Sequence, residues 1–267
     1  MLKKILTLLL TVAALVSANA ADTLTLARKT SLLSIPLQRG SIECQIEAEM
    51  PVSGSTALFE NLSQRLSAAV AKATGIKNIE KSGTTVSMPA LSELESNFAR
   101  YIETAMRTQQ RDAKATGLTL DILMRREYET TRLVTFRIEV TFYGLDGKRH
   151  IANDRVTLLK SNGKTLTWND LVNKKQRAKM SKAVARSLFG YFGVMDFINL
   201  KNALTDTTLN ETNFPLPQNG PAITADGLFI IYAPGEIASE ERGQPIGTIK
   251  LQSVWSQLTP TAKKLLK

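Results

Sequence analysis

The sequence has one cysteine and one histidine in 267 residues, and this scarcity excludes several kinds of chemistry. With Cys44 alone, no disulfide can form within the chain, so its stability depends on packing. The pattern around Cys44 favours a buried, inert thiol, with a reactive or intermolecular thiol as the alternative. Zinc sites need several cysteine or histidine ligands, so we expect neither a metal nor a cofactor.

Recognisable catalytic motifs are also missing. A Ser-His-Asp arrangement would have to use His150, and no Gly-x-Ser-x-Gly motif accompanies it. Gly163-Lys164-Thr165 resembles the end of a phosphate-binding loop, but Leu158 stands where that loop needs a glycine. We therefore interpret this segment as a hairpin turn and predict that the chain is not an enzyme.

Carboxylate pairs are the remaining source of catalysis to consider, because two of them at the right separation can hydrolyse a glycoside. Alternation places Glu127 and Glu129 on one strand face, and Glu236, Glu240 and Glu241 cluster in a loop. Acidic residues are also common on any solvated face. An envelope hydrolase using the loop carboxylates and His150 is the alternative function that the sequence leaves open.

No apolar run is long enough to span a bilayer, which takes about 20 residues. The longest, Ile5–Val16, follows Lys3 and Lys4 and precedes small residues at 18–20, which is typical of a signal peptide. We expect cleavage after Ala20, and no lipoprotein cysteine follows it. The sequence thus predicts a periplasmic or secreted protein without a membrane span.

The chain is strongly basic, with a formal net charge of +10 that falls to +8 when the two lysines of residues 1–20 are removed. Such a charge attracts anionic partners, and the predicted compartment disfavours nucleic acid. The apolar content of 43% is enough for a packed core.

The hydrophobic periodicity predicts an α+β fold, in which an antiparallel sheet packs with several amphipathic helices. A strand is expected around residues 42–48, followed by helices over 58–73 and 91–106. Alternation from Leu118 to Trp168, with turns at 144–148 and 161–164, predicts an antiparallel meander. Helical spacing returns over 168–192, short strands follow near 222, 228 and 246, and a helix carries Val254, Trp255 and Leu258.

A basic stripe lies on the predicted helix 168–192. Lys175, Lys179, Lys182 and Arg186 are spaced by four, three and four residues, which places them on one side. This stripe could bind an anionic polymer or surface. The other interpretation is a solvated helix face, because no aromatic residues alternate with the charges.

The segment Tyr232–Pro245 is the most polar connection between two predicted strands. Pro234 and Gly235 are expected to turn the chain, with Ile237 and Ala238 against the core and residues 240–242 in solvent. Loops beside a rigid sheet often bind ligands. Tyr232, Glu236 and Glu240 are therefore candidate binding residues together with His150, although the loop can also be a structural connection.

Three segments resemble a known family when they are taken together: Ile46–Leu66, Phe142–Val172 and Asn213–Leu258, with its "YAPGEIA" turn. They are similar to the RsiV-like C-terminal domain family of unknown function, with a companion domain of the PdaC type upstream. The resemblance implies an exported α+β module without catalysis of its own. Only Gly147 and His150 match the family's Gly-Gly-Ala-His turn.

The expected organisation is a signal peptide over 1–20, a companion subdomain over 21–117 and an RsiV-like domain over 118–267. The family's anti-sigma and deacetylase segments have no counterpart in this sequence, so those activities are not transferred. The sequence predicts a cell-envelope binding module whose partner is a wall polymer, a glycan or an envelope protein.

Overall fold

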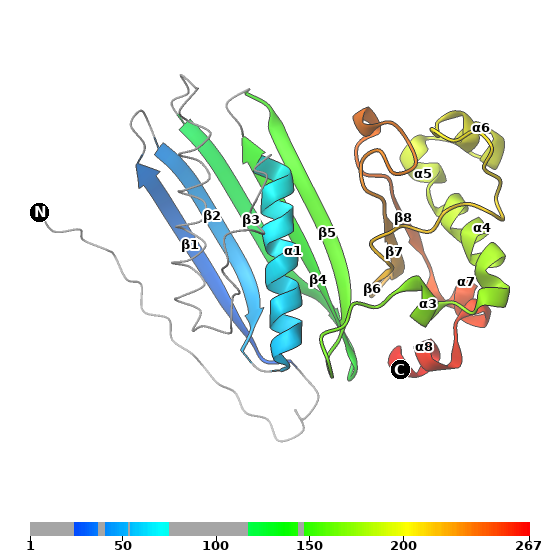
Figure 1. Ribbon diagram of the computed structural model, residues 1–267, viewed down its shortest axis with the longest axis horizontal. Helices are drawn as coiled ribbons and strands as arrows, with labels where there is room; N and C mark the ends of the chain where they lie inside the picture. The colour runs from blue at the N-terminus through cyan, green and yellow to red at the C-terminus, as the bar shows by residue number, and fades with distance from the viewer. Residues whose placement is uncertain (1–23, 37–40, 53, 75–116, 144–146) are drawn as a thin grey trace, which may run out of the picture.

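The computed structural model describes residues 24–36, 41–52, 54–74, 117–143 and 147–267. The predicted signal peptide and the predicted helix over 91–106 lie outside these ranges. The described chain forms a sheet body and a second, helix-rich body, which lie side by side (Figure 1). This arrangement confirms the α+β class.

The sheet body contains five strands in the order β1-β2-β3-β4-β5. These strands are β1 (Leu26–Pro36), β2 (Ser41–Pro51), β3 (Gly117–Glu129), β4 (Leu133–Tyr143) and β5 (Arg149–Leu159). β2 and β3 are parallel and the other neighbours are antiparallel, so the predicted meander from β3 to β5 is confirmed. The division predicted at residue 117 stays a prediction, and β2 and β3 pair across it.

Helix α1 (Thr56–Thr74) covers one face of this sheet (Figure 1). Its apolar stripe, which includes Leu58, Leu62 and Val70, packs on the inward residues of the strands. Cys44 is fully buried in this first core, as the alternation predicts, and burial raises the pKa of its thiol to about 12. A protonated, inaccessible thiol is a packing residue.

The prediction that Glu127 and Glu129 share a strand face is wrong. A β-bulge shifts the register of β3 against β4 between Arg126 and Tyr128. Glu129 therefore lies opposite Val134, which is buried beneath α1, whereas Glu127 contacts Arg155 on the outer face. The two carboxylates cannot act as a pair.

The turn after β5 is the predicted hairpin and fixes the chain against α1. Leu159 N donates to Lys164 O at 2.9 Å, and Gly163 has a φ of +66°. A Cβ at Gly163 would lie 2.2 Å from Leu58 N, so only glycine fits this contact. The "GKT" segment is thus a hairpin and not a phosphate loop.

The second body is built on the antiparallel sheet β6 (Ala222–Thr224), β7 (Gly227–Ile231) and β8 (Ile246–Ile249). Its helical segments are α3 (Trp168–Leu171), η2 (Lys174–Gln176), α4 (Arg177–Ser187), α5 (Phe189–Phe192), α6 (Phe197–Asn202), η3 (Glu240–Arg242), α7 (Leu251–Val254), η4 (Trp255–Gln257) and α8 (Pro260–Leu265). Residues such as Met180, Val184, Tyr232 and Val254 form a second core.

Two predicted helices are broken, and one contact accounts for both breaks. Val172 and Leu258 are extended and form an isolated antiparallel bridge. Asn173 then caps η2, and Thr259 caps α8, in which Pro260 occupies the first turn. In the expected helix over 168–192, the bridge separates α3 from η2, and a second break at Leu188 separates α4 from α5.

Polar and stacking contacts join the two bodies along the outer face of β5. Ile223 N donates to Thr157 Oγ1 at 2.8 Å, and the Arg155 guanidinium lies 3.6 Å from the centroid of the Phe229 ring. Gln244 Nε2 also donates to Asn153 O at 3.1 Å. These residues place the second body on the sheet face opposite α1.

Candidate functional site

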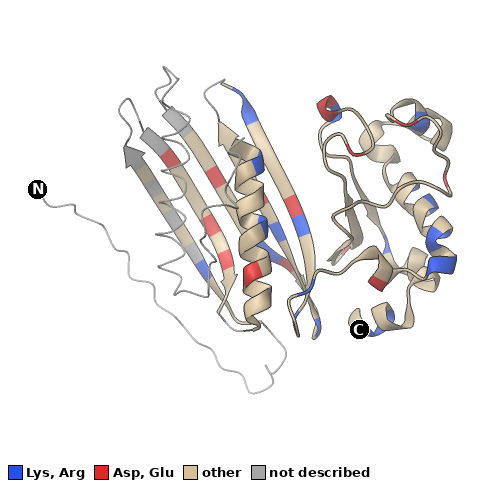
Figure 2. Ribbon diagram, in the orientation of Figure 1, with Lys and Arg blue, Asp and Glu red and all other residues tan. Residues whose placement is uncertain are grey.

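The predicted basic stripe forms one continuous side of the second body, even though its helix is divided. Lys175 lies on η2, and Lys179, Lys182 and Arg186 lie on α4, while Met180 and Val184 point into the core. The basic side points away from the five-stranded sheet (Figure 2). A large ligand can therefore approach it without meeting the sheet body.

The four cations differ in their partners. Glu211 contacts both Lys182 and Arg186, with N–O distances of 2.7 and 3.2 Å. The hydrogen bonds and charges of these two side chains hold the pKa of Glu211 below its usual value. By contrast, no acceptor in the described part of the chain contacts the ammonium of Lys175 or Lys179. The stripe thus presents two uncompensated cations.

Tyr232 and Glu236 stabilise the loop over 232–245 through hydrogen bonds to the backbone. Tyr232 is fully buried, and its hydroxyl donates to Pro215 O at 2.5 Å. Burial raises its pKa above the ordinary tyrosine value. The carboxylate of Glu236 accepts from Ala233 N and Gln218 N, each at 2.8 Å. Both side chains therefore hold the loop in place.

The expected path of the loop is confirmed. Ile237 and Ala238 are buried, and residues 240–242 form η3, which is exposed to solvent. Of the three loop candidates, Tyr232 is buried, Glu236 is half-buried and Glu240 is exposed. Its side chain packs beside Gly235, whose φ of +80° makes the turn.

His150 lies apart from the loop carboxylates. It pairs in register with Phe142, a residue of the first core, and the two ring centroids are 6.2 Å apart. His150 is therefore on the α1 face of β5, whereas the second body contacts the opposite face through Arg155. The sheet separates this histidine from Glu236 and Glu240.

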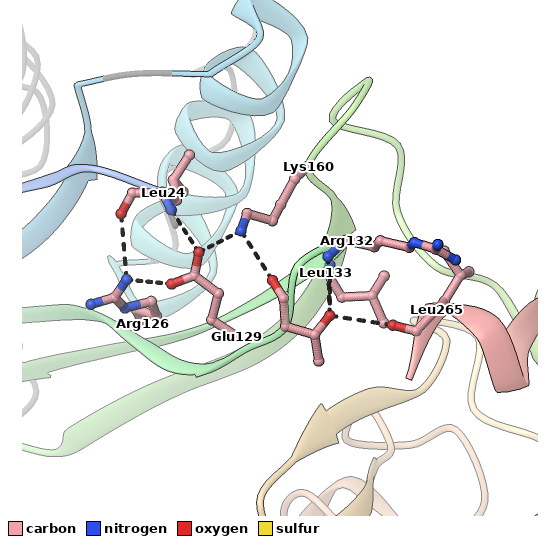
Figure 3. Close-up of polar contacts among 8 residues, drawn as sticks. Leu24, Arg126, Glu129, Arg132, Leu133, Lys160 and Leu265 are labelled. Carbon is pink, nitrogen blue, oxygen red and sulfur yellow. Dashed lines mark hydrogen bonds and ion pairs between the residues drawn. The ribbon is translucent and has the colours of Figure 1, made fainter. Parts of the chain in front are cut away.

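A polar joint at one end of the sheet was not found from the sequence (Figure 3). Glu129 Oε1 accepts from Leu24 N and from Lys160 Nζ, each at 2.7 Å, and Oε2 binds Arg126. Burial alone would raise the pKa of Glu129, but these donors outweigh it and the pKa lies below its usual value.

The turn between β3 and β4 extends this joint to the end of the chain. Thr130 Oγ1 donates to Leu265 O at 3.2 Å (Figure 3). The Arg132 guanidinium donates to Lys264 O at 3.0 Å. These donors satisfy carbonyls at the C-terminus of α8. The first strands and the last helix are therefore held by one cluster.

A cleft of about 880 Å³ lies beside this joint, between the two bodies. Its lining includes Arg132, Lys160, Leu166, Asp170 and Leu265. Lys160 is held by Glu129, and the Asp170 carboxylate accepts from Thr167 N at 2.9 Å in a capping box. These charged groups already have protein partners. We therefore interpret the cleft as part of a structural joint and not as a reaction site.

No local sequence pattern indicates this joint, because its partners are remote along the chain. Leu24 and Glu129 are separated by 105 residues, and Thr130 and Leu265 by 135 residues. Charge patterns detect neighbours three or four positions apart. Only the pairing of strands brings these groups together.

The described ranges contain neither a metal-binding cluster nor a membrane-spanning helix. Histidine, cysteine and acidic side chains do not gather there in groups of three or more that could hold a metal ion. Among the helices of the described segments, none is long and apolar enough to cross a membrane.

Comparison with known proteins shows which fold this chain has but does not indicate its function. No family model matches the sequence, and no curated protein matches it. A crystal structure of a DUF3298 family member from Bacteroides fragilis NCTC 9343 superposes with a TM-score of 0.58 at 15% identity, covering 91% of this chain and 98% of that one. A DUF3298 family protein from Pseudomonas aeruginosa PAO1 superposes with a TM-score of 0.53 at 13% identity, covering 90% and 97%. The chain therefore has the fold seen in these DUF3298 proteins.

Proposed function

We propose that this chain is an exported, non-catalytic cell-envelope binding module that holds an anionic wall polymer or glycan on the basic side of η2 and α4. In this proposal, residues 1–20 are a signal peptide, and the mature protein is periplasmic or secreted. The RsiV-like domain and its PdaC-type companion are part of the same proposal, to which the likeness to DUF3298 structures contributes the fold alone.

The observation that carries the proposal is the difference between the two halves of the basic stripe. Glu211 contacts both Lys182 and Arg186 and offsets one of their two positive charges, so these side chains are partly engaged within the fold. Lys175 and Lys179 are exposed on the outward side of the second body, beside the exposed Lys174 and Arg177. Cations without an internal partner are available to an anionic ligand.

Co-sedimentation of residues 21–267 with isolated peptidoglycan across a salt series tests this proposal. We expect binding that survives moderate salt and falls about tenfold or more in the Lys175→Glu/Lys179→Glu variant. The matched control is Lys250→Glu/Lys267→Glu, which makes the same charge change at other exposed positions of the second body.

Equal losses in both variants would show only general attraction of a basic protein, which salt screens. Absence of binding at low salt would overturn the wall-polymer proposal and leave an envelope protein as the partner to seek. The hydrolase alternative has a separate test, since it requires turnover of a wall substrate that Glu240→Ala or His150→Ala abolishes without unfolding the protein.

A further inference from the structure

An exposed apolar tip is formed by Met195, which joins α5 to α6, and by Ile198, which lies in the first turn of α6. Met195 is 94% exposed and Ile198 is 75% exposed, and Tyr191 beside them is 38% exposed. Single exposed apolar residues are ordinary on protein surfaces. Here two large side chains three positions apart project from the same short segment, and this grouping requires an explanation.

The tip is held outward by a well-anchored base. α5 ends at Gly193 in the left-handed conformation, and Val194 N donates to Phe189 O at 2.9 Å. The Phe197 ring then packs edge-on against Phe214, with centroids 6.1 Å apart, and Leu200 is fully buried. Because the neighbours are fixed to the core, Met195 and Ile198 are presented to solvent by the fold.

The tip continues directly from the basic side of α4. Arg186, whose side chain is 57% exposed, lies in the last turn of α4, and α5 begins three residues later. In Figures 1 and 2, α4 and α6 lie on the side of the second body that faces away from the five-stranded sheet. An apolar tip bordered by cations matches a surface that is anionic outside and apolar within.

The acidic residues near the tip are compatible with such a surface. Asp196 accepts from Asn199 N at 2.8 Å and from Asn199 Nδ2 at 2.9 Å, so its carboxylate is held at the start of α6. Glu240 and Glu241 belong to η3, which is joined to Tyr191 because the Tyr191 hydroxyl donates to Arg242 O, and η3 also carries the exposed cation Arg242. A second copy of the chain is disfavoured because the basic sides would repel each other.

We infer that the α5–α6 tip is a membrane-surface anchor, in which Met195 and Ile198 enter the interface of an anionic phospholipid bilayer. The basic side of η2 and α4 contacts the headgroups beside it. Such an anchor lies on the membrane and does not cross it. This anchor goes beyond wall-polymer binding, because it assigns a lipid partner to Met195 and Ile198, which do not belong to the basic stripe.

Sedimentation with sucrose-loaded vesicles tests this anchor. Vesicles of phosphatidylcholine containing phosphatidylglycerol should pellet the protein, and vesicles of phosphatidylcholine alone should pellet much less. Met195→Ser/Ile198→Ser removes apolar surface without changing charge, and we expect about tenfold weaker partition. The control Leu32→Ser/Val52→Ser removes two exposed apolar side chains from the sheet body and should bind like the wild type.

The same variants separate the anchor from the wall-polymer proposal. The tip variant should keep the wild-type affinity for peptidoglycan, while Lys175→Glu/Lys179→Glu weakens binding to both targets. If the tip variant binds anionic vesicles as well as the wild type does, attraction is purely electrostatic and the anchor is wrong. If neither protein pellets with vesicles, the anchor is also wrong, and the tip becomes a candidate surface for a protein partner.

A label at the tip reports insertion directly. Cys44 is fully buried and protonated at neutral pH, so Met195→Cys can be labelled selectively with an environment-sensitive fluorophore. A blue shift on adding anionic vesicles is expected for insertion. Unchanged emission, with the protein bound, would overturn the anchor and show that the tip stays in water.

Discussion

The two bodies of this protein use their surface charges differently. On the outer face of the sheet body, Arg125, Arg137 and Arg155 lie in one row across β3, β4 and β5. Like charges directly opposite each other destabilise a sheet. Here Arg125 contacts Glu47 at 2.5 Å, Arg137 contacts Glu139 and Arg155 contacts Glu127 at 2.8 Å.

The second body leaves part of its charge and part of its apolar surface uncovered. Lys175 and Lys179 have no acceptor within the described residues, and Met195 and Ile198 project into solvent. The difference indicates a division of roles. The sheet body pairs the arginine row of its outer face with its own carboxylates. The second body presents groups that an external partner can contact.

Breaking a pair on the sheet should have the largest effect on stability. Arg155→Met keeps the aliphatic stem but removes the ion pair with Glu127 and the contact with the Phe229 ring. Since Glu127 would keep a partly buried charge, we expect the free energy of unfolding to fall by about 2 kcal/mol. Urea denaturation measures this change.

The double variant Glu127→Gln/Arg155→Met should be less destabilised than the sum of the single variants, because neither charge is left alone. Arg28→Met is the exposed control, with a side chain 62% accessible, and should change stability by less than about 0.5 kcal/mol. A loss as large for Arg28 as for Arg155 would contradict the idea that burial makes the sheet pairs important.

The Glu129 joint should make the sheet body sensitive to acid. The folded protein holds the pKa of Glu129 below its ordinary value of 4.5, so the unfolded chain binds this proton more tightly. The resulting stabilisation is present above the ordinary pKa and is lost as the pH falls through the folded pKa. Glu129→Gln should therefore flatten the stability profile between about pH 5 and pH 3.

Thermal denaturation across that range, with Glu241→Gln as an exposed control, measures the difference between the profiles. Glu129→Gln should also be less stable at neutral pH, because Lys160 and Arg126 lose their anionic partner. Parallel profiles for wild type and Glu129→Gln would show that the joint does not cause the acid sensitivity.

Much of the fold follows from local patterns in the sequence. Alternation predicts β2 and the meander, and the apolar stripe predicts α1 within two residues of its observed start at Thr56. The patterns fail where a remote contact overrides them. The bridge between Val172 and Leu258 interrupts two helices, and a bulge turns Glu127 away from Glu129.

The candidate surfaces were only partly predictable for the same physical reason. Spacing along a helix correctly places the basic stripe on one side, but Glu211, which contacts two of its four cations, is 25 residues from Arg186. The tip could not be distinguished from a core segment, because Met195 and Ile198 have the composition of buried residues. Whether an apolar side chain is exposed depends on tertiary packing, and hydrophobic periodicity in the sequence does not contain that information.

The smallest expected effect on stability separates the two halves of the basic stripe. In the wild type, Lys182 Nζ lies 2.7 Å from Glu211 Oε2. Lys182→Glu replaces this ammonium with a second carboxylate and should destabilise the protein by about 0.5–1 kcal/mol. Lys179→Glu makes the same charge change on the same helix without meeting Glu211, and should alter stability by less than about 0.5 kcal/mol. Adding Glu211→Gln should recover part of the loss in Lys182→Glu and change Lys179→Glu little. Equal losses for the two lysines in urea denaturation would mean that the whole stripe is structural, and that no part of it is reserved for a partner.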